Sequence, residues 1–285
     1  MTVVGTGVLI AEARRRGHGL PAFNVITLEH AEAIVDAASR AGRGVVLALS
    51  ENAIRYHEGA AAPILAAVHT LASRAGTSLG IHLDHLIDDA LVDEAIHGPL
   101  RPFVSSLMYD GGALPYAENL ARTKQVVDDG HAAGLWVEAE LGFVGGKQGA
   151  AQSAHAPGVR TDPDEAAAFV AATGVDALAV AVGSSHAMTT RTARLDHDLI
   201  AALHAAVPVP LVLHGSSGVP ADELRRAVSA GMTKINIGTA LNVALTAALR
   251  QALDADPEVT DPRRYLAPAR LAMRDAVLRT LDEMG

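Results

Sequence analysis

Short apolar runs alternate with longer amphipathic segments along almost the whole chain. The apolar runs are rich in Val, Ile and Leu, and a polar break follows each of them, a pattern typical of buried parallel strands. The longer segments carry apolar residues at helical spacing. We predict strands at residues 20–25, 44–49, 79–83, 103–107, 135–140, 175–182, 208–213 and 232–237.

The segments between these runs predict helices, and several of their ends carry capping signals. Thr161-Asp-Pro-Asp precedes one helical segment, and Gly134, Gly174 and Gly231 follow the ends of others. We predict helices at residues 28–41, 60–75, 88–97, 115–133, 163–173, 196–206, 220–230 and 239–253, with flanking helices at 4–16 and 262–283.

This alternation indicates the fold class. Eight strands that alternate with eight helices imply parallel βαβ units. No linker, low-complexity tract or block of like charge divides the chain, and α/β barrels of this size are often undivided. We predict an α/β fold, a (β/α)8 TIM barrel, as a single domain over residues 1–285. The active site of such a barrel lies at the carboxyl ends of its strands.

Composition narrows the classes of partner. The chain has 32 acidic and 23 basic residues, with a formal net charge of −9. No basic stripe is visible, so we expect no nucleic-acid partner. Neither a signal peptide nor a long apolar segment is recognisable, so we expect a cytoplasmic protein without a membrane partner. The chain has no cysteine, so a metal would need His, Asp, Glu or water ligands.

Three histidines stand at matching places in three repeats. His85, His186 and His214 follow the strands predicted third, sixth and seventh, and three imidazoles with one open position suit catalytic Zn²⁺. For each histidine alone, a hydrogen-bonded structural role is the alternative, but the shared placement favours a metal. His82 lies two residues before Asp84, on the same face of the strand, and we expect it to be structural.

Carboxylates accompany these histidines. Asp84 directly precedes His85 and is a candidate general acid/base, with orientation of an imidazole as the alternative. Asp110 and Glu140 lie at other strand ends. Three roles remain open for these two: a second cation position, hydrogen bonds to substrate, or ion pairs.

Two glycine-containing turns indicate phosphate binding. "HGSSG" at 214–218 and "NIGT" at 236–239 follow the last two predicted strands and precede helices. In this fold these two loops commonly bind phosphate, and backbone N–H groups at a helix start attract anions. Ordinary strand-to-helix turns are the alternative. An acidic protein could bind a sugar phosphate in this way.

The chain resembles the class II, metal-dependent ketose-bisphosphate aldolases, which include fructose- and tagatose-bisphosphate aldolases. The resemblance runs from "PAFNV" near the start to "YLAPARLAM" near the end. Its specific blocks between these are "LDH", "AELGFVGG", "TGVDALAVAVGSSH", "LVLHGSSGVP" and "KINIGT".

The resemblance implies one catalytic Zn²⁺ on the three histidines and Asp84 as the acid/base at the scissile bond. It also implies a monovalent cation (Na⁺ or K⁺), a homodimer or homotetramer, and a second cation position at Asp110 and Glu140. Residues matching the family's substrate- and phosphate-binding positions are Asn24, Ser50, Gly215, Ser217, Asn236 and Thr239.

The implied reaction is retro-aldol cleavage of fructose or tagatose 1,6-bisphosphate to dihydroxyacetone phosphate and glyceraldehyde 3-phosphate, as in glycolysis. Another phosphorylated ketose, such as an inositol-breakdown intermediate, is an alternative. Further alternatives are a metal-dependent epimerase, isomerase or hydrolase, an inactive sugar-phosphate-binding protein, and a Schiff-base aldolase using Lys234. We expect Lys234 to be a buried counter-charge instead.

The chain departs from the family at several positions. The family's loop after "GG" carries an acidic residue with a proton-transfer role, but here Lys147 and Gln148 follow. His155 or water is the candidate replacement. Ala187 and Ala240 stand where the family has a glycine and an acidic residue.

Overall fold

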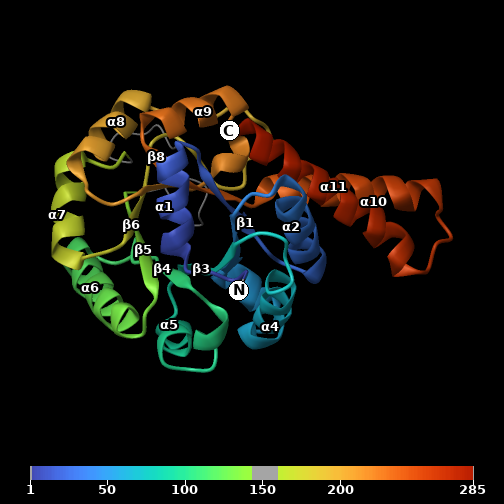
Figure 1. Ribbon diagram of the computed structural model, residues 1–285, viewed down its shortest axis with the longest axis horizontal. Coiled ribbons are helices and arrows are strands. Elements are labelled where there is room, and N and C mark those ends of the chain that lie inside the picture. Colours follow the sequence, from blue (N-terminus) through green and yellow to red (C-terminus); the bar gives the residue numbers. More distant parts are fainter. Residues whose placement is uncertain (1, 143–159, 285) are drawn as a thin grey trace.

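Each strand of the protein pairs in parallel with the next along the chain, and the eighth pairs with the first (Figure 1). The computed structural model describes residues 2–142 and 160–284. The closed barrel confirms the predicted (β/α)8 fold. Its strands are β1 (Leu20–Asn24), β2 (Val45–Ser50), β3 (Leu79–Leu86), β4 (Ser106–Tyr109), β5 (Trp136–Leu141), β6 (Ala177–Val180), β7 (Leu211–Leu213) and β8 (Met232–Ile237).

Helices surround this barrel (Figure 1). They are α1 (Thr6–Arg16), α2 (Leu28–Ala41), α3 (Glu51–Tyr56), α4 (Ala61–Ala72), α5 (Asp89–Ile96), α6 (Tyr116–Ala132), α7 (Pro163–Thr173), α8 (His197–Ala206), α9 (Ala221–Ala230), α10 (Thr239–Ala255) and α11 (Pro262–Glu283), with 3-10 turns η1 (Arg101–Phe103) and η2 (Ser216–Gly218).

Some elements differ from their predicted bounds. The β7 ladder begins only at Leu211, because Pro208 and Pro210 have no N–H to donate to a neighbouring strand. The pattern also missed α3, whose six residues are too few for helical periodicity to be recognisable. Ser50 caps this helix, and its Oγ accepts a hydrogen bond from the Ala53 N–H at 3.2 Å.

The amino-terminal helix α1 lies across one end of the barrel (Figure 1). The N–H of Val4 donates to the carbonyl of Leu79 at 2.9 Å, at the start of β3. The hydroxyl groups of Thr6 and Ser106 are 2.6 Å apart, at the start of β4. Because α1 covers the amino ends of the strands, the carboxyl ends form the available mouth.

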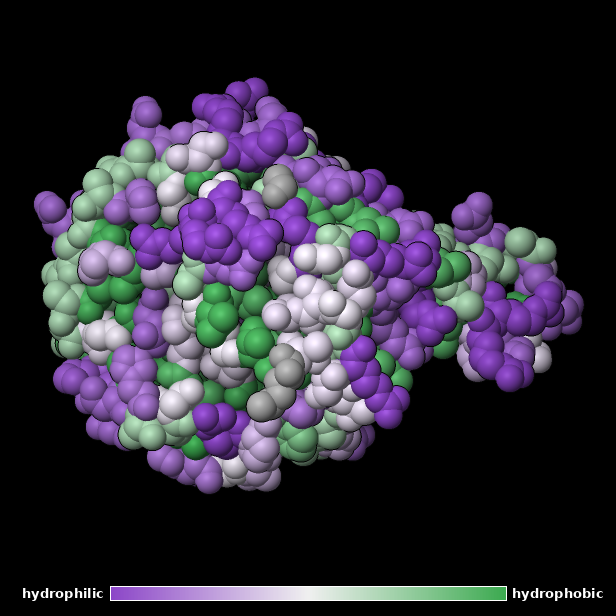
Figure 2. Space-filling model, in the orientation of Figure 1, coloured by the Kyte–Doolittle hydropathy of each residue, from purple (hydrophilic) through white to green (hydrophobic). Residues whose placement is uncertain are grey.

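Helices α10 and α11 form an arm that projects away from the barrel (Figure 1). Leu241 is the buried residue of α10, whereas Val243 and Leu253 on that helix and Leu271 on α11 are exposed. Figure 2 shows hydrophobic and hydrophilic residues side by side over the arm. Among the described helices, none combines the length and apolar character needed to cross a bilayer.

Candidate active site

A backbone irregularity places His85 at the barrel mouth. The pairing of β3 with β4 shifts register between Leu83 and Leu86. His85, inside that shift, has a φ of 53°, in the left-handed region that residues with a Cβ rarely adopt. Such bulges re-aim a side chain and recur beside active sites. The strained backbone therefore marks His85 as a functional candidate.

Two imidazoles meet at this mouth, and a carboxylate fixes the proton on each. The Nδ1 of His85 lies 2.8 Å from an oxygen of Asp110, and the Nε2 of His214 lies 3.0 Å from an oxygen of Glu138. A carboxylate accepts a hydrogen bond, so each of these nitrogens carries the proton. The remaining nitrogens, Nε2 of His85 and Nδ1 of His214, are 2.9 Å apart.

His186 and Glu140 complete a compact donor group with these two imidazoles. One potential ligand atom from each of His85, Glu140, His186 and His214 lies within 4.8 Å of all the others. Tetrahedral zinc with bonds of 2.0–2.1 Å places its ligands about 3.3 Å apart. The donor set of three imidazoles and one carboxylate therefore suits a zinc-like ion in both chemistry and scale.

Glu138 connects this group to the barrel interior. Its second oxygen lies 2.7 Å from the Nζ of Lys234, and both side chains are fully buried. Burial would raise the pKa of Glu138, but the charge of Lys234 and the hydrogen bond from His214 lower that pKa to about 2. The expectation that Lys234 is a counter-charge is confirmed. The site role of Glu138 was missed, although its spacing of two from Glu140 indicates a shared inward face.

Asp84 is buried beside the donor group and held by two amides. Asn236 donates to its Oδ1 at 3.1 Å, and Asn24 donates to its Oδ2 at 3.0 Å. Burial alone would raise the pKa of Asp84, but electrostatic interaction with the neighbouring His85, His214 and Lys234 outweighs it and holds that pKa well below its usual value. Asp84 is therefore ionised and can accept a proton.

A cavity of about 280 Å³ opens above these groups. The predicted site residues line it, apart from Asp110, which contacts His85, and Glu140, which belongs to the donor group. Those that line it are Asn24, Ser50, Asp84, His85, His186, His214, Gly215, Ser217, Asn236 and Thr239. Lining residues that the sequence analysis did not select are Ile26, Asn52, Ser185, Ala187, Gly238 and Asn242.

The two glycine-containing turns lie together at one side of the cavity. Gly215 has a φ of 68°, and a Cβ there would lie 2.6 Å from the carbonyl carbon of Ser185. The Oγ of Ser217 accepts a hydrogen bond from the Ala240 N–H at 3.1 Å, which joins the first turn to the start of α10. These contacts place the turn at Gly215 against the backbone of Ser185 and beside the start of α10.

The comparison with known families decides the identity of the barrel. The family model described as fructose-bisphosphate aldolase class-II matches residues 4–285. The chain belongs to this family. It is therefore a lyase, and class II aldolases are generally metal-dependent and act on sugar phosphates.

Solved structures agree with this assignment. The aldolase is similar to the YdjI aldolase of Escherichia coli K12, with 28% identity and a TM-score of 0.84 over 99% of this chain and 97% of that one. A Coccidioides immitis protein, described as a candidate fructose-1,6-bisphosphate aldolase, has 28% identity and a TM-score of 0.85 over 98% of this chain and 95% of that one. The Campylobacter jejuni fructose-bisphosphate aldolase, at 21% identity and a TM-score of 0.83, covering 99% and 95%, shares the fold.

Departures of this aldolase from the family pattern fall partly at the cavity. Ala187 lines the cavity beside His186 and has a φ of 59°, in the region that favours glycine. Its backbone thus keeps the glycine-like conformation although a methyl group is present. Lys147, Gln148 and His155 lie outside the described residues.

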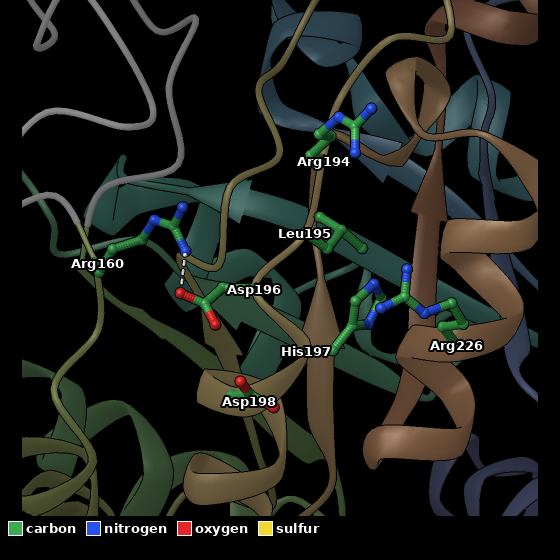
Figure 3. Close-up of a pocket in the computed structure, with 7 residues that line it drawn as sticks. All are labelled: Arg160, Arg194, Leu195, Asp196, His197, Asp198 and Arg226. Atoms are coloured by element: carbon green, nitrogen blue, oxygen red, sulfur yellow. Dashed lines mark hydrogen bonds and ion pairs between the residues drawn. The ribbon is translucent and has the colours of Figure 1, made fainter.

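A second, larger pocket on the aldolase has a different character (Figure 3). It measures about 410 Å³ and includes several cationic side chains. Arg160 pairs with Asp196 at 3.1 Å, and the carboxylate of Glu223 lies 2.8 Å from Arg226 and 3.0 Å from His197. Two of its three arginines are thus paired with carboxylates, and the potential metal-ligand group among the described residues lies at the barrel mouth instead.

Proposed function

We propose that this aldolase cleaves a ketose bisphosphate of the fructose or tagatose type to dihydroxyacetone phosphate and glyceraldehyde 3-phosphate, and catalyses the reverse condensation. The observation that carries the proposal is the 2.9 Å approach of His85 Nε2 to His214 Nδ1. In each of these two imidazoles, the other ring nitrogen is hydrogen-bonded to a carboxylate. A shared cation satisfies two such lone pairs directly.

Zn²⁺ is the proposed cofactor, held by His85, His186 and His214, with Glu140 close enough to be a further ligand. When bound, the ion would supply Lewis-acid polarisation of the ketose carbonyl. Asp110 and Glu138 keep the imidazoles in the tautomers that offer a lone pair. A second cation at Asp110 and Glu140 and a monovalent Na⁺ or K⁺ remain predictions.

Asp84 is the proposed catalytic acid/base. In the cleavage direction it takes the proton from the substrate hydroxyl whose oxygen becomes the aldehyde, and it returns that proton in the condensation. Asn24 and Asn236 hold its two oxygens and leave the cavity side of the carboxylate available. The side-chain amides of Asn24 and Asn236 therefore orient Asp84, in addition to lining the substrate cavity.

The turns at Gly215, Ser217 and Thr239 are the proposed phosphate site, with Ser50 and the amides near the rest of the substrate. At the start of α10, the N–H of Ala240 donates to Ser217 and that of Leu241 to the Gly238 carbonyl, so the N–H of Thr239, the first residue of the helix, would face the phosphate. Bound phosphate would fix the reacting carbon atoms relative to Asp84.

We further propose a single domain over residues 1–285 that acts in the cytoplasm, in carbohydrate metabolism, as a homodimer or homotetramer. The projecting arm supports the oligomer, since Val243, Leu253 and Leu271 expose apolar side chains on it. Exposed apolar side chains on a projecting segment could be covered by a second copy of the chain.

A coupled triose-phosphate assay over a panel of ketose phosphates, with and without added zinc, tests the function. We expect triose phosphate from a ketose bisphosphate, loss of activity with EDTA, and recovery with Zn²⁺. Activity that survives exhaustive chelation, with substrate trapped on Lys234 by borohydride, would instead indicate a Schiff base. An epimeric sugar phosphate as the product would indicate an epimerase.

A further inference from the structure

The cavity wall contains an amide whose orientation is set from behind. Asn242, in the first turns of α10, lines the cavity. Its Oδ1 lies 3.1 Å from the Nε2 of His30, which is a buried residue of α2. Two segments that are 212 residues apart in sequence thus meet directly behind the cavity wall.

Backbone geometry fixes the proton on His30. The N–H of Thr27 donates to the Nδ1 of His30 at 3.3 Å, so Nδ1 is the acceptor nitrogen and Nε2 carries the hydrogen. Burial lowers the pKa of His30, which favours this neutral form. The Nε2–H therefore donates to Asn242 and requires its oxygen, rather than its nitrogen, to face away from the cavity.

We infer that Asn242 is a specificity-determining residue of the proposed aldolase reaction, and that His30 is the positioning residue that aims it. The inference rests on the proposed function for its substrate. With Oδ1 held by His30, the NH₂ group of Asn242 is left to donate to an acceptor oxygen of the substrate. Asn242 lies one helical turn after Thr239, which belongs to the proposed phosphate site. The acceptor is therefore a phosphate oxygen or a hydroxyl oxygen of the substrate.

Removal of the donor tests the contact. Asn242→Leu keeps a similar side-chain volume and loses the amide, so KM for the best ketose phosphate should rise about 10-fold while kcat changes less than 3-fold. Gln251→Leu makes the same chemical change at an exposed position of the same helix and should leave both constants as in the wild type. Unchanged KM in Asn242→Leu would overturn the inference.

Asn242→Asp identifies the acceptor. A carboxylate still accepts from His30 but no longer donates. If the substrate atom is a phosphate oxygen, charge repulsion should raise KM well beyond the value of Asn242→Leu. If it is a hydroxyl oxygen, the hydroxyl can donate to the carboxylate, and KM should stay near that of the wild type.

A double-mutant cycle tests the positioning role. His30→Ala should raise KM in the wild-type background and have little further effect in Asn242→Leu, because the interaction is already lost. His30→Gln, which retains a donor, should partly restore KM. If His30→Ala raised KM by the same factor in both backgrounds, His30 would have only a structural role.

Failure of the proposed function can be separated from failure of this inference. Calorimetric titration of fructose 1,6-bisphosphate into Asp84→Ala, with and without Asn242→Leu, measures binding without turnover. A dissociation constant about 10-fold higher in the double variant supports the contact even if no aldol cleavage is found. Equal affinities of the two variants would overturn it.

Discussion

The Nε2 atom of His85 lies 2.9 Å from the Nδ1 atom of His214, although 129 residues separate them in sequence. Each imidazole has its other nitrogen bonded to a carboxylate. The carboxylates therefore act on any bound metal indirectly, because they determine which nitrogen offers a lone pair.

The first prediction concerns this indirect control. Asp110→Asn should weaken zinc binding about 10- to 100-fold, because an amide no longer provides a charged acceptor for the Nδ1–H of His85. Competition with a chromophoric chelator measures the affinity. Asp128→Asn, at an exposed ion pair with Lys124 on α6, is the matched control. Equal zinc affinity in the two variants would argue against the role of Asp110.

The second prediction separates catalysis from metal binding. Asp84→Ala should retain zinc, as measured by elemental analysis of the purified protein, and lose about 10²- to 10⁴-fold in kcat. His214→Ala should lose both zinc and activity. Normal turnover by Asp84→Ala would refute its role as acid/base, whereas loss of zinc from that variant would make it a residue of the metal site.

The third prediction concerns pH and stability. The Nδ1 of His82 lies 2.8 Å from the Ser106 hydroxyl, and burial, together with the charge of Lys234, lowers the pKa of His82 to about 3. The unfolded imidazole protonates below about pH 6.5, so the unfolded state binds more protons as the pH falls from 6.5 toward 3. The free energy of unfolding should fall by up to about 1.4 kcal/mol per pH unit from this group.

Urea unfolding of the wild type and of His82→Gln at pH 6 and pH 5 measures this contribution. Other groups titrate equally in both proteins, so the stability of the variant should depend less steeply on pH. Parallel pH dependences would show that His82 is not the group responsible.

The fourth prediction uses two glycines with the same φ of 68°. Gly17→Ala should cost about 1–2 kcal/mol of stability, because only the left-handed backbone is strained and no atom lies within 4 Å of the new Cβ. Gly215→Ala should cost clearly more and weaken zinc binding, because its Cβ would press on Ser185, next to His186. Equal melting temperatures of the two variants would contradict the clash.

The fifth prediction concerns the arm. Leu253→Glu should shift the protein toward monomers in sedimentation velocity, because a charge would enter the proposed interface. Val8→Glu, at an exposed apolar residue of α1, should leave the sedimentation coefficient unchanged. The proposed role of the arm would be wrong if Leu253→Glu sedimented as the wild type does.

The sequence alone determined the barrel and the strand ends that carry His85, His186 and His214. Strand-to-helix alternation is a local signal, because each element must present a particular apolar face to the core. Parallel strands then place their carboxyl ends at one mouth, so residues at matching repeat positions were predictable as a group.

Only the tertiary structure decided which partner each polar group takes. Glu138 bridges His214 and Lys234. Asn24 and Asn236 donate hydrogen bonds to Asp84. The buried imidazole of His30 sets the orientation of the Asn242 amide. Such pairings depend on side-chain directions, on the register shift at His85 and on which nitrogen carries a proton. Those are settled by packing between distant segments, and residue spacing along the chain does not encode them.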